Sequence, residues 1–157
     1  MNDVKGNPSS LILVSPAVTP WYKPEWGSLY ANNPSVRLFS YRKEDGKILN
    51  YKQFYVNLEE ANKRELLQWK LEYQMPQEFL PQEKVVDKDS MWRVFQELRR
   101  NVTLFQRYFE FNSVGWKVPG GCNEKCKRSQ ICGICCSDTQ VWKNCLLNGT
   151  IPVKRGD

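Results

Sequence analysis

Apolar and polar residues alternate between residues 35 and 56 with the period of two that is typical of β-strands. We expect strands over 35–42 and 47–56, joined by the turn Lys43-Glu44-Asp45-Gly46. An Asp-Gly pair between two such segments is a strong signal for a hairpin. The sequence therefore predicts a β-hairpin here. The residues expected on one face of its first strand are Val36, Leu38 and Ser40.

The chain before the hairpin divides into a lead, a strand and a long loop. Residues 1–10 are polar and contain Gly, Pro and Ser, so we expect a disordered lead or a severed linker. Residues 11–15 are mostly apolar and precede Pro16, which predicts a short buried strand. Residues 16–34 are rich in proline and large aromatic residues, and they predict a rigid, ordered loop.

That loop is the best candidate for a binding surface. Trp21 and Tyr22 are bracketed by prolines, which limit the conformational freedom of this segment. A wall of Trp and Tyr suits an apolar, sugar, base or quaternary-ammonium group. The alternative interpretation is that the rings pack beneath the neighbouring hairpin.

After residue 57 the pattern changes to the period of an α-helix. Helix-forming residues predominate over 58–74, which predicts a first helix that Pro76 ends. The residues expected on its apolar face are Leu66, Trp69 and Tyr73.

A connector over 77–88 separates this helix from a second one. Asp89 or Ser90 should cap the N-terminus of the second helix, which we expect to run for about 20 residues. Its apolar stripe recurs at spacings of three and four and predicts a face packed into the core. The residues of the stripe are Met91, Phe95, Leu98, Val102, Phe105 and Phe109.

The chemistry of the chain is limited by the residues it lacks. None of its 157 residues is histidine, which excludes a catalytic triad, a histidine acid or base and a histidine-ligated zinc within them. No apolar run approaches the roughly 20 residues that span a membrane. The net charge of +6 comes without a long basic tract, so we expect a solvated basic surface and no nucleic-acid partner.

All 6 cysteines lie between residues 122 and 145. Four of them form a frame: Cys122, Cys126, Cys132 and Cys145. Disulfides would staple this segment, whereas four thiolates could hold a zinc ion. The spacing departs from the usual pair of C-x2-C knuckles, which favours disulfides. Cys135 and Cys136 are adjacent and cannot easily pair with each other, so we expect free thiols or bonds in trans.

The cysteines and the N-terminus point to different compartments. A disulfide module indicates an exported protein, and the sequons at Asn101 and Asn148 would accept N-linked glycans there. Residues 1–8 lack the apolar segment of a signal peptide. Either the thiols are reduced, or the chain is the C-terminal piece of a longer precursor.

Several segments along residues 11–150 resemble, in order, the acid sphingomyelinase-like phosphodiesterases. They are Val14-Ser15-Pro16-Ala17-Val18-Thr19-Pro20-Trp21, Asn32-Asn33-Pro34-Ser35-Val36-Arg37-Leu38-Phe39, Tyr55-Val56-Asn57-Leu58, Trp69-Lys70-Leu71-Glu72-Tyr73 and Leu104-Phe105-Gln106-Arg107-Tyr108. The cysteine spacing and the Asn-Asn-Pro-x-x-Arg element are specific to this family when they occur together. The chain is thus identified with the C-terminal portion of that family.

The resemblance implies an α+β fold of the metallophosphoesterase superfamily. Residues 11–57 would be the last strands of its β-sandwich, and residues 58–150 would form a helical subdomain stapled by disulfides. The implied disulfide pairs are Cys122–Cys126 and Cys132–Cys145. Residues 151–157 would be a tail.

The resemblance also implies an activity for the complete family member. There, two zinc ions held by Asp, Asn and His residues activate a water that attacks a phosphodiester or pyrophosphate. Sphingomyelin, nucleotides and related phosphoesters are the substrates. The metal-binding half precedes the matched region, so no catalytic residue, metal ligand or cofactor carries over to this chain. Only Trp21, with Tyr22 and Asn33, would transfer, as residues that wall the substrate cleft.

Three functional hypotheses result, of which the third is a cytosolic zinc module held by four thiolates. In the first, the chain is the C-terminal part of an extracellular or lysosomal zinc phosphodiesterase, inactive by itself, that supports the fold and walls the cleft. Its partners would be the metal-binding core that precedes it and a lipid or nucleotide phosphoester, with a membrane surface as a further candidate. In the alternative, the chain is a non-catalytic module from a truncated gene that binds lipid headgroups or a partner.

Overall fold

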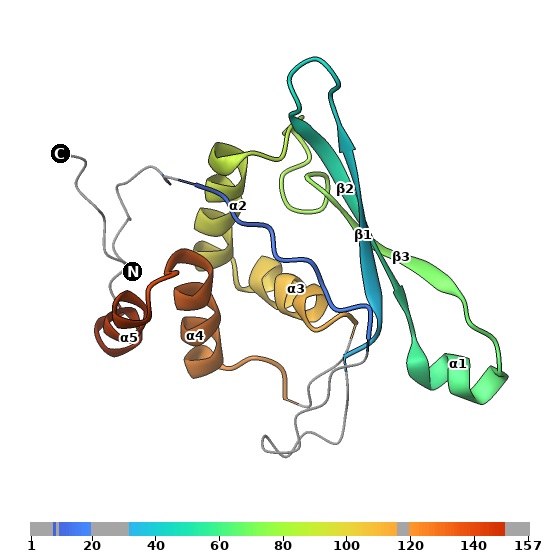
Figure 1. The fold of residues 1–157 in the computed structure, drawn as a ribbon. Coiled ribbons are helices and arrows are strands. Elements are labelled where there is room, and N and C mark those ends of the chain that lie inside the picture. The colour runs from blue at the N-terminus through green and yellow to red at the C-terminus, as the bar shows by residue number, and fades with distance from the viewer. Residues whose placement is uncertain (1–7, 9, 20–31, 116–119, 150–157) are drawn as a thin grey trace.

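The computed structural model describes residues 8, 10–19, 32–115 and 120–149, and these have the expected α+β architecture. Its elements are β1 (Ser35–Tyr41), β2 (Ile48–Val56), α1 (Leu58–Arg64), β3 (Trp69–Met75), α2 (Lys88–Arg100), α3 (Val102–Asn112), α4 (Glu124–Cys135) and α5 (Thr139–Asn148). The strands form an antiparallel sheet in the order β1-β2-β3. Helices α2 to α5 lie on one side of this sheet, and α1 lies near its end (Figure 1).

The predicted hairpin is confirmed as β1 and β2. Gly46 adopts a φ of 70° in the turn, a conformation that glycine reaches without steric cost. The carboxylate of Asp45 accepts a hydrogen bond from the backbone N–H of Lys47 at 3.2 Å. Val36 and Leu38 share a face of β1 as predicted, and it is the outer face, where Leu38 is 61% exposed.

The strand predicted over residues 11–15 is wrong, because these residues form no strand in the structure. The chain there runs close to β1. The guanidinium of Arg37 donates to the carbonyl of Val14 at 2.7 Å, and the backbone N–H of Ser35 donates to the carbonyl of Ala17 at 3.0 Å. One backbone bond does not make the continuous ladder that a strand requires, and Val14 is 77% exposed.

The helix predicted over 58–74 is only half right. Helix α1 ends at Arg64, and Glu65 adopts a left-handed conformation with a φ of 53°. The chain then returns as β3, which pairs with β2 from Val56↔Trp69 to Tyr51↔Met75. Pairing with the open edge of β2 therefore overrides the local helical preference of Trp69 and Tyr73, and Leu66 lies between α1 and β3.

The second predicted helix is divided into α2 and α3. Asn101 is both the C-cap of α2 and the N-cap of α3, where its side chain accepts a hydrogen bond from the N–H of Leu104. The break turns Val102 outward to 55% exposure, whereas Phe105 becomes fully buried. The apolar stripe is confirmed on both sides of Asn101 but is wrong at Val102.

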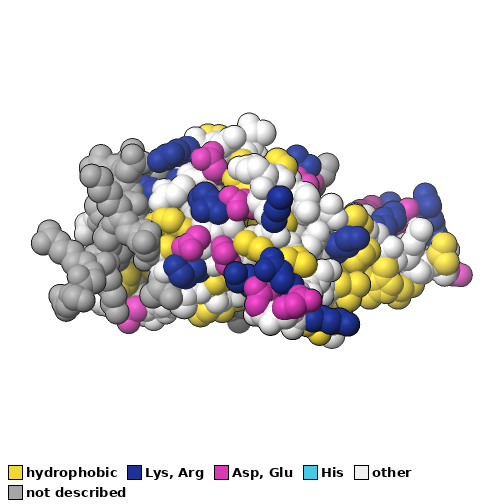
Figure 2. Space-filling view, turned by 90° about the horizontal axis from the view of Figure 1, so that it is seen from above, with side chains coloured by type: hydrophobic (Ala, Val, Ile, Leu, Met, Phe, Trp, Pro, Cys, Tyr) yellow, Lys and Arg dark blue, Asp and Glu magenta, His cyan; other side chains and the backbone are white. Residues whose placement is uncertain are grey.

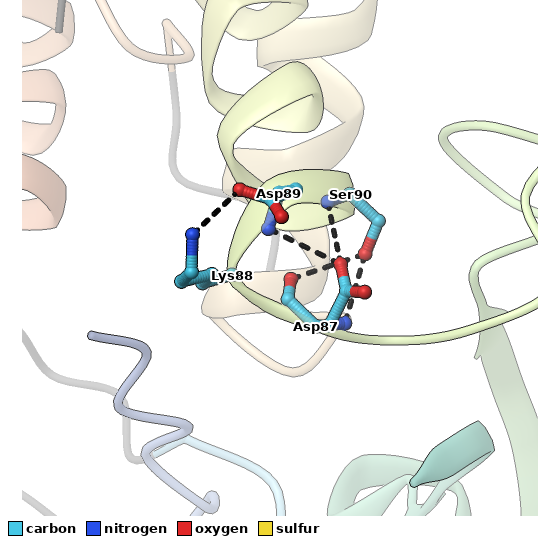
Figure 3. A network of polar contacts seen from close by, with 4 residues as sticks. All are labelled: Asp87, Lys88, Asp89 and Ser90. Carbon is cyan, nitrogen blue, oxygen red and sulfur yellow. Dashed lines mark hydrogen bonds and ion pairs between the residues drawn. The ribbon is translucent and has the colours of Figure 1, made fainter. Parts of the chain in front are cut away.

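The N-cap of α2 is Asp87, two residues before Asp89, the nearer of the two predicted positions. Its carboxylate accepts hydrogen bonds from the N–H groups of Asp89 and Ser90, at 3.1 and 2.8 Å. The Ser90 hydroxyl in turn accepts from the N–H of Asp87 at 2.9 Å. Figure 3 shows this reciprocal arrangement, in which both residues satisfy helix-end donors that would otherwise lack partners.

The main core lies between the inner face of the sheet and helices α2, α3 and α4. Tyr73 of β3 stacks on Phe111 of α3, with ring centroids 4.5 Å apart. The ammonium group of the buried Lys127 on α4 lies 5.4 Å from the ring centroid of Phe105, close enough for a cation–π contact. The other fully buried side chains at its centre include Met75, Phe95, Leu98 and Ile131.

A second, smaller cluster joins α4 to α5 around the cysteines. The structure bonds Cys122 to Cys126 and Cys132 to Cys145. These are the two pairs that the family resemblance implies, and they leave Cys135 and Cys136 as free thiols. The alternative of a zinc ion held by the four frame thiolates does not fit, since these sulfur atoms are bonded in pairs. Among the helices described, none has the length and apolar character required to cross a bilayer.

Candidate functional site

Of the three residues predicted to wall a cleft, the structure describes Asn33. Trp21 and Tyr22 lie outside the described residues. Asn33 is buried, and both ends of its amide bond to the backbone: Nδ2 donates to the carbonyl of Val114 at 2.8 Å, and Oδ1 accepts from the N–H of Leu58 at 3.1 Å. This side chain therefore ties three distant segments together, and its role at a cleft stays a prediction.

A β-bulge in β3 brings the carboxylate of Glu72 close to Gln53 of β2. Gln53 pairs with Tyr73, and the next pair is Phe54 with Leu71, so Glu72 has no partner in the ladder. A bulge of this kind leaves the extra residue unpaired and can re-aim its side chain to the other face of the sheet. The carboxylate of Glu72 thus accepts a hydrogen bond from Nε2 of Gln53 at 2.6 Å, on the inner face.

Gln53 is the centre of a buried polar network on that face. Its Oε1 accepts hydrogen bonds from Nε of Arg37 at 2.7 Å and from the hydroxyl of Tyr73 at 3.3 Å. A second guanidinium nitrogen of Arg37 donates to the Tyr73 hydroxyl at 3.1 Å. The same guanidinium lies 4.9 Å from the ring centroid of Tyr51. The network links all three strands through side chains as well as through the backbone.

The environment changes the acidity of two groups in this network. Burial raises the pKa of Glu72 to about 7, although the hydrogen bond from Gln53 and the charge of Arg37 oppose the shift. The nearby carboxylate of Glu110 adds to the increase. Burial likewise raises the pKa of Tyr73 well above its usual range. Glu72 can therefore exchange a proton near neutral pH, whereas Tyr73 stays a neutral hydroxyl.

Arg37 of this network, together with the neighbouring Asn33 and Ser35, holds both ends of the segment that carries Trp21 and Tyr22. On the N-terminal side, Arg37 binds the carbonyl of Val14. On the C-terminal side, Asn33 binds Val114, and the hydroxyl of Ser35 donates to the carbonyl of Phe54 at 2.8 Å. The arrangement can position a loop, and it offers one titratable carboxyl group close to the loop's base.

Sequence reasoning did not identify Arg37, Gln53, Glu72 and Tyr73 as a network. The available signal was Gln53, a polar residue at an inward position between Tyr51 and Tyr55 in a predicted strand. A buried amide requires hydrogen-bond partners, which indicates a polar cluster. The sequence does not identify the partners, because its pattern predicts a helix for the segment that contains Glu72 and Tyr73.

The family resemblance implies zinc, and the residues of this chain do not fit a two-zinc site. The sequence contains no histidine. Within the described ranges, the one group of three potential ligands gathers Cys135, Cys136 and Cys145, and Cys145 is in a disulfide. A pair of hydrolytic zinc ions requires several nitrogen and oxygen ligands around open positions, so no catalytic step can be derived from these residues.

Both predicted glycosylation sites lie at helix ends. Asn101 is exposed, and its Oδ1 caps α3 at 3.0 Å from the N–H of Leu104. An N-glycan attaches to the amide nitrogen, so capping and glycosylation use different atoms. Asn148 is the exposed last residue of α5, and Thr150 of its sequon lies outside the described residues. Modification of either site stays a prediction.

Comparison with known proteins places this chain in a family. The model of the acid sphingomyelin phosphodiesterase C-terminal region matches residues 7–151. The chain is 31% identical over 154 residues to acid sphingomyelinase-like phosphodiesterase 3b of Homo sapiens, which covers 96% of this chain and 33% of that protein. It is 32% identical over 149 residues to cyclic GMP-AMP phosphodiesterase SMPDL3A of Mus musculus, covering 93% and 32%.

A third relative matches over a similar share of the chain. Sphingomyelinase phosphodiesterase C of Dictyostelium discoideum is 29% identical over 147 residues, which cover 94% of this chain and 32% of that protein. The chain thus spans about one third of the length of these relatives.

Proposed function

Because this chain belongs to the acid sphingomyelin phosphodiesterase C-terminal region family, we propose that it is the C-terminal part of a sphingomyelinase-like phosphodiesterase. In the complete protein, hydrolysis of a phosphodiester would take place at zinc ions whose ligands this chain does not supply. The role of the chain would be to complete the fold and to wall the substrate cleft. Phosphodiesterase is the activity that the names of its relatives share.

The observation that carries this proposal is an apolar face of the sheet that is turned away from the helices. We call it the outer sheet face, and its residues are Val36, Leu38, Phe54, Trp69 and Leu71. Leu38 is 61% exposed and Leu71 is 52% exposed. Figure 2 places hydrophobic side chains at the surface of the end of the molecule that carries β3 and α1. Exposed apolar surface of this kind marks an interaction site.

The occupant that we propose for the outer sheet face is the catalytic portion of the same protein. The relatives are about three times longer than the matched region, so each has a large remainder that could pack there. A β-sandwich has two sheets that pack face to face, and β1-β2-β3 would contribute the last strands of one of them. The charged and polar side chains on the helical side would remain in solvent.

The loop that carries Trp21 and Tyr22 would lie at the substrate end of the cleft. Two hydrogen bonds support this by holding the two ends of that segment: Asn33 donates a buried one to the carbonyl of Val114, and Arg37 donates an exposed one to the carbonyl of Val14. A rigid base would orient the aromatic side chains with little loss of conformational entropy. The substrate would be a lipid or nucleotide phosphoester.

We further propose an extracellular or lysosomal location. Two disulfides favour an oxidising compartment, and both sequons lie at exposed asparagine residues. Treatment of the protein from a secretory host with a glycosidase should reduce its mass if Asn101 or Asn148 is modified. The double variant Asn101→Gln/Asn148→Gln is the control that should show no such change.

The first test uses the chain by itself. The purified, oxidised chain should contain no stoichiometric zinc after dialysis and should not hydrolyse bis-p-nitrophenyl phosphate. Circular dichroism should confirm that the sample is folded. Zinc-dependent turnover by this chain would show that the catalytic machinery lies within it and would overturn the proposal.

The second test replaces the matched third of the human 3b relative with this chain. The chimera should hydrolyse bis-p-nitrophenyl phosphate, and Leu71→Asp should abolish this activity by placing a charge in the packed interface. Leu147→Asp is the matched control, because Leu147 is a 79% exposed leucine on α5, away from the outer sheet face. Equal activities of the two variants would contradict the proposed interface.

A further inference from the structure

Four sulfur atoms gather where α4 meets α5. Cys132 is bonded to Cys145, and the free Cys135 and Cys136 follow at the C-terminal end of α4. The sulfur atoms of Cys135, Cys136 and Cys145 all lie within 4.8 Å of one another. A disulfide therefore has two thiols close to one of its own sulfur atoms.

The helix presents two of these cysteines to the same partner. Cys132 and Cys136 are four residues apart, and the N–H of Cys136 donates to the carbonyl of Cys132 at 3.1 Å as the last helical bond. Residues with this spacing lie on one face of a helix. Both pack in the same small cluster with Cys145 of α5. Cys145 consequently has two candidate partners on adjacent turns of α4.

We propose that Cys132, Cys136 and Cys145 form a thiol–disulfide exchange site in which Cys145 can be bonded to either of the other two. The thiolate of Cys136 attacks Sγ of Cys145, and the Cys136–Cys145 bond forms as the Cys132–Cys145 bond breaks. The electron pair leaves with Cys132, which takes up the proton that Cys136 lost. The number of disulfides and thiols is unchanged, so no oxidant or reductant is needed.

Cys135 is placed to assist this exchange. Its sulfur lies 2.9 Å from that of Cys136, and either atom can donate the S–H hydrogen bond. Burial raises the pKa of Cys135 to about 12, and its neighbour Cys136 adds to the effect. Cys135 thus stays a thiol at neutral pH, and its S–H can stabilise the thiolate of Cys136. We assign Cys135 a positioning role and Cys136 the nucleophilic one.

The surroundings favour exchange within the chain over exchange with external thiols. Cys132, Cys136 and Cys145 are all buried, which restricts access by glutathione or another protein thiol. Moving the bond from Cys132 to Cys136 shifts the attachment of α5 by four residues toward the C-terminal end of α4, a rise of about 6 Å along a helix. Val141 and Trp142 of α5 pack against the cluster, so the two pairings would give two packing arrangements of α5.

The decisive variant is Cys132→Ser. The proposal expects Cys145 to pair with Cys136 in this variant, which fragmentation mass spectrometry of non-reduced peptides can identify, with only Cys135 left as a thiol. The matched control is Cys126→Ser, which should leave Cys122 as a free thiol because no further sulfur is grouped with it in the described part of the chain. A free Cys145, or a Cys135–Cys145 bond, in the Cys132→Ser variant would overturn the assignment.

The wild-type chain provides a test that does not depend on the folding of a variant. The oxidised protein is held at about pH 9, where thiolates form readily, and its thiols are then alkylated without reduction. Exchange predicts label on Cys132 that increases with time, and Cys136→Ser should abolish it. Label confined to Cys135 and Cys136 after prolonged incubation would show that the disulfide does not exchange.

Discussion

The amide of Gln53 donates a 2.6 Å hydrogen bond to the carboxylate of Glu72, although the ladder pairs Gln53 with Tyr73. The contact exists because Glu72 is the extra residue of a bulge and turns to the inner face of the sheet. Burial in this position raises the pKa of Glu72 to about 7 from an ordinary value of 4.5. A single register shift thereby places a titratable group at the base of the loop that carries Trp21.

We predict that Glu72 makes the stability of the chain depend on pH. The pKa of Glu72 is higher in the folded state than in the unfolded state. The contribution of Glu72 to the free energy of unfolding is therefore fully present below pH 4.5 and is lost as the pH increases through about 7. Glu72→Gln should remove this decrease and leave the protein more stable than wild type at pH 8. Urea denaturation of both proteins at pH 4.5 and 8 measures the effect. Glu44→Gln, in the exposed hairpin turn, should keep the wild-type dependence, and an unchanged profile for Glu72→Gln would contradict the prediction.

Asn33 should contribute strongly to stability whatever its role at a cleft. Asn33→Ala removes the partners of the Val114 carbonyl and the Leu58 N–H, and each buried group left unpaired costs about 1–3 kcal/mol. The free energy of unfolding from urea titration measures this loss. Asn144→Ala is the control, since Asn144 is exposed and only accepts a 3.2 Å bond from Gln140 on the same helix. Similar losses for the two variants would exclude the anchoring role.

The break at Asn101 can be tested by comparing two residues of the predicted stripe. Phe105→Ala should destabilise the chain by about 3–5 kcal/mol, because it empties a fully buried site. Val102→Ala should change stability by less than about 0.5 kcal/mol, because Val102 is 55% exposed. Thermal or urea denaturation distinguishes the cases, and comparable losses would indicate one continuous helix.

The capping box of α2 should behave as a coupled pair. Asp87→Ala and Ser90→Ala should each cost about 1 kcal/mol, and the double variant should cost less than their sum, since each residue satisfies the other's backbone. Asp89→Ala removes only an exposed ion pair with Lys88 and should have a small effect. Additive losses in the double-mutant cycle would show that Asp87 and Ser90 act independently.

The sequence alone was sufficient where the deciding interactions are local. The Asp45-Gly46 turn defines the β1–β2 hairpin, because glycine there reaches a positive φ without strain. The spacing of apolar residues predicted most of the buried face of α2 and α3. The cysteine frame, with the Asn-Asn-Pro-x-x-Arg element, identified the family and, through it, both disulfide pairs.

Only the tertiary structure decided the features that depend on distant partners. Trp69 to Met75 have helical spacing, yet they form β3 because the free edge of β2 offers hydrogen bonds along its length. The face of β1 that carries Leu38 is outward because Gln53 and Tyr51 occupy the inner side. Local patterns determine what a segment can form, and long-range pairing and burial determine which of those structures has the lowest free energy.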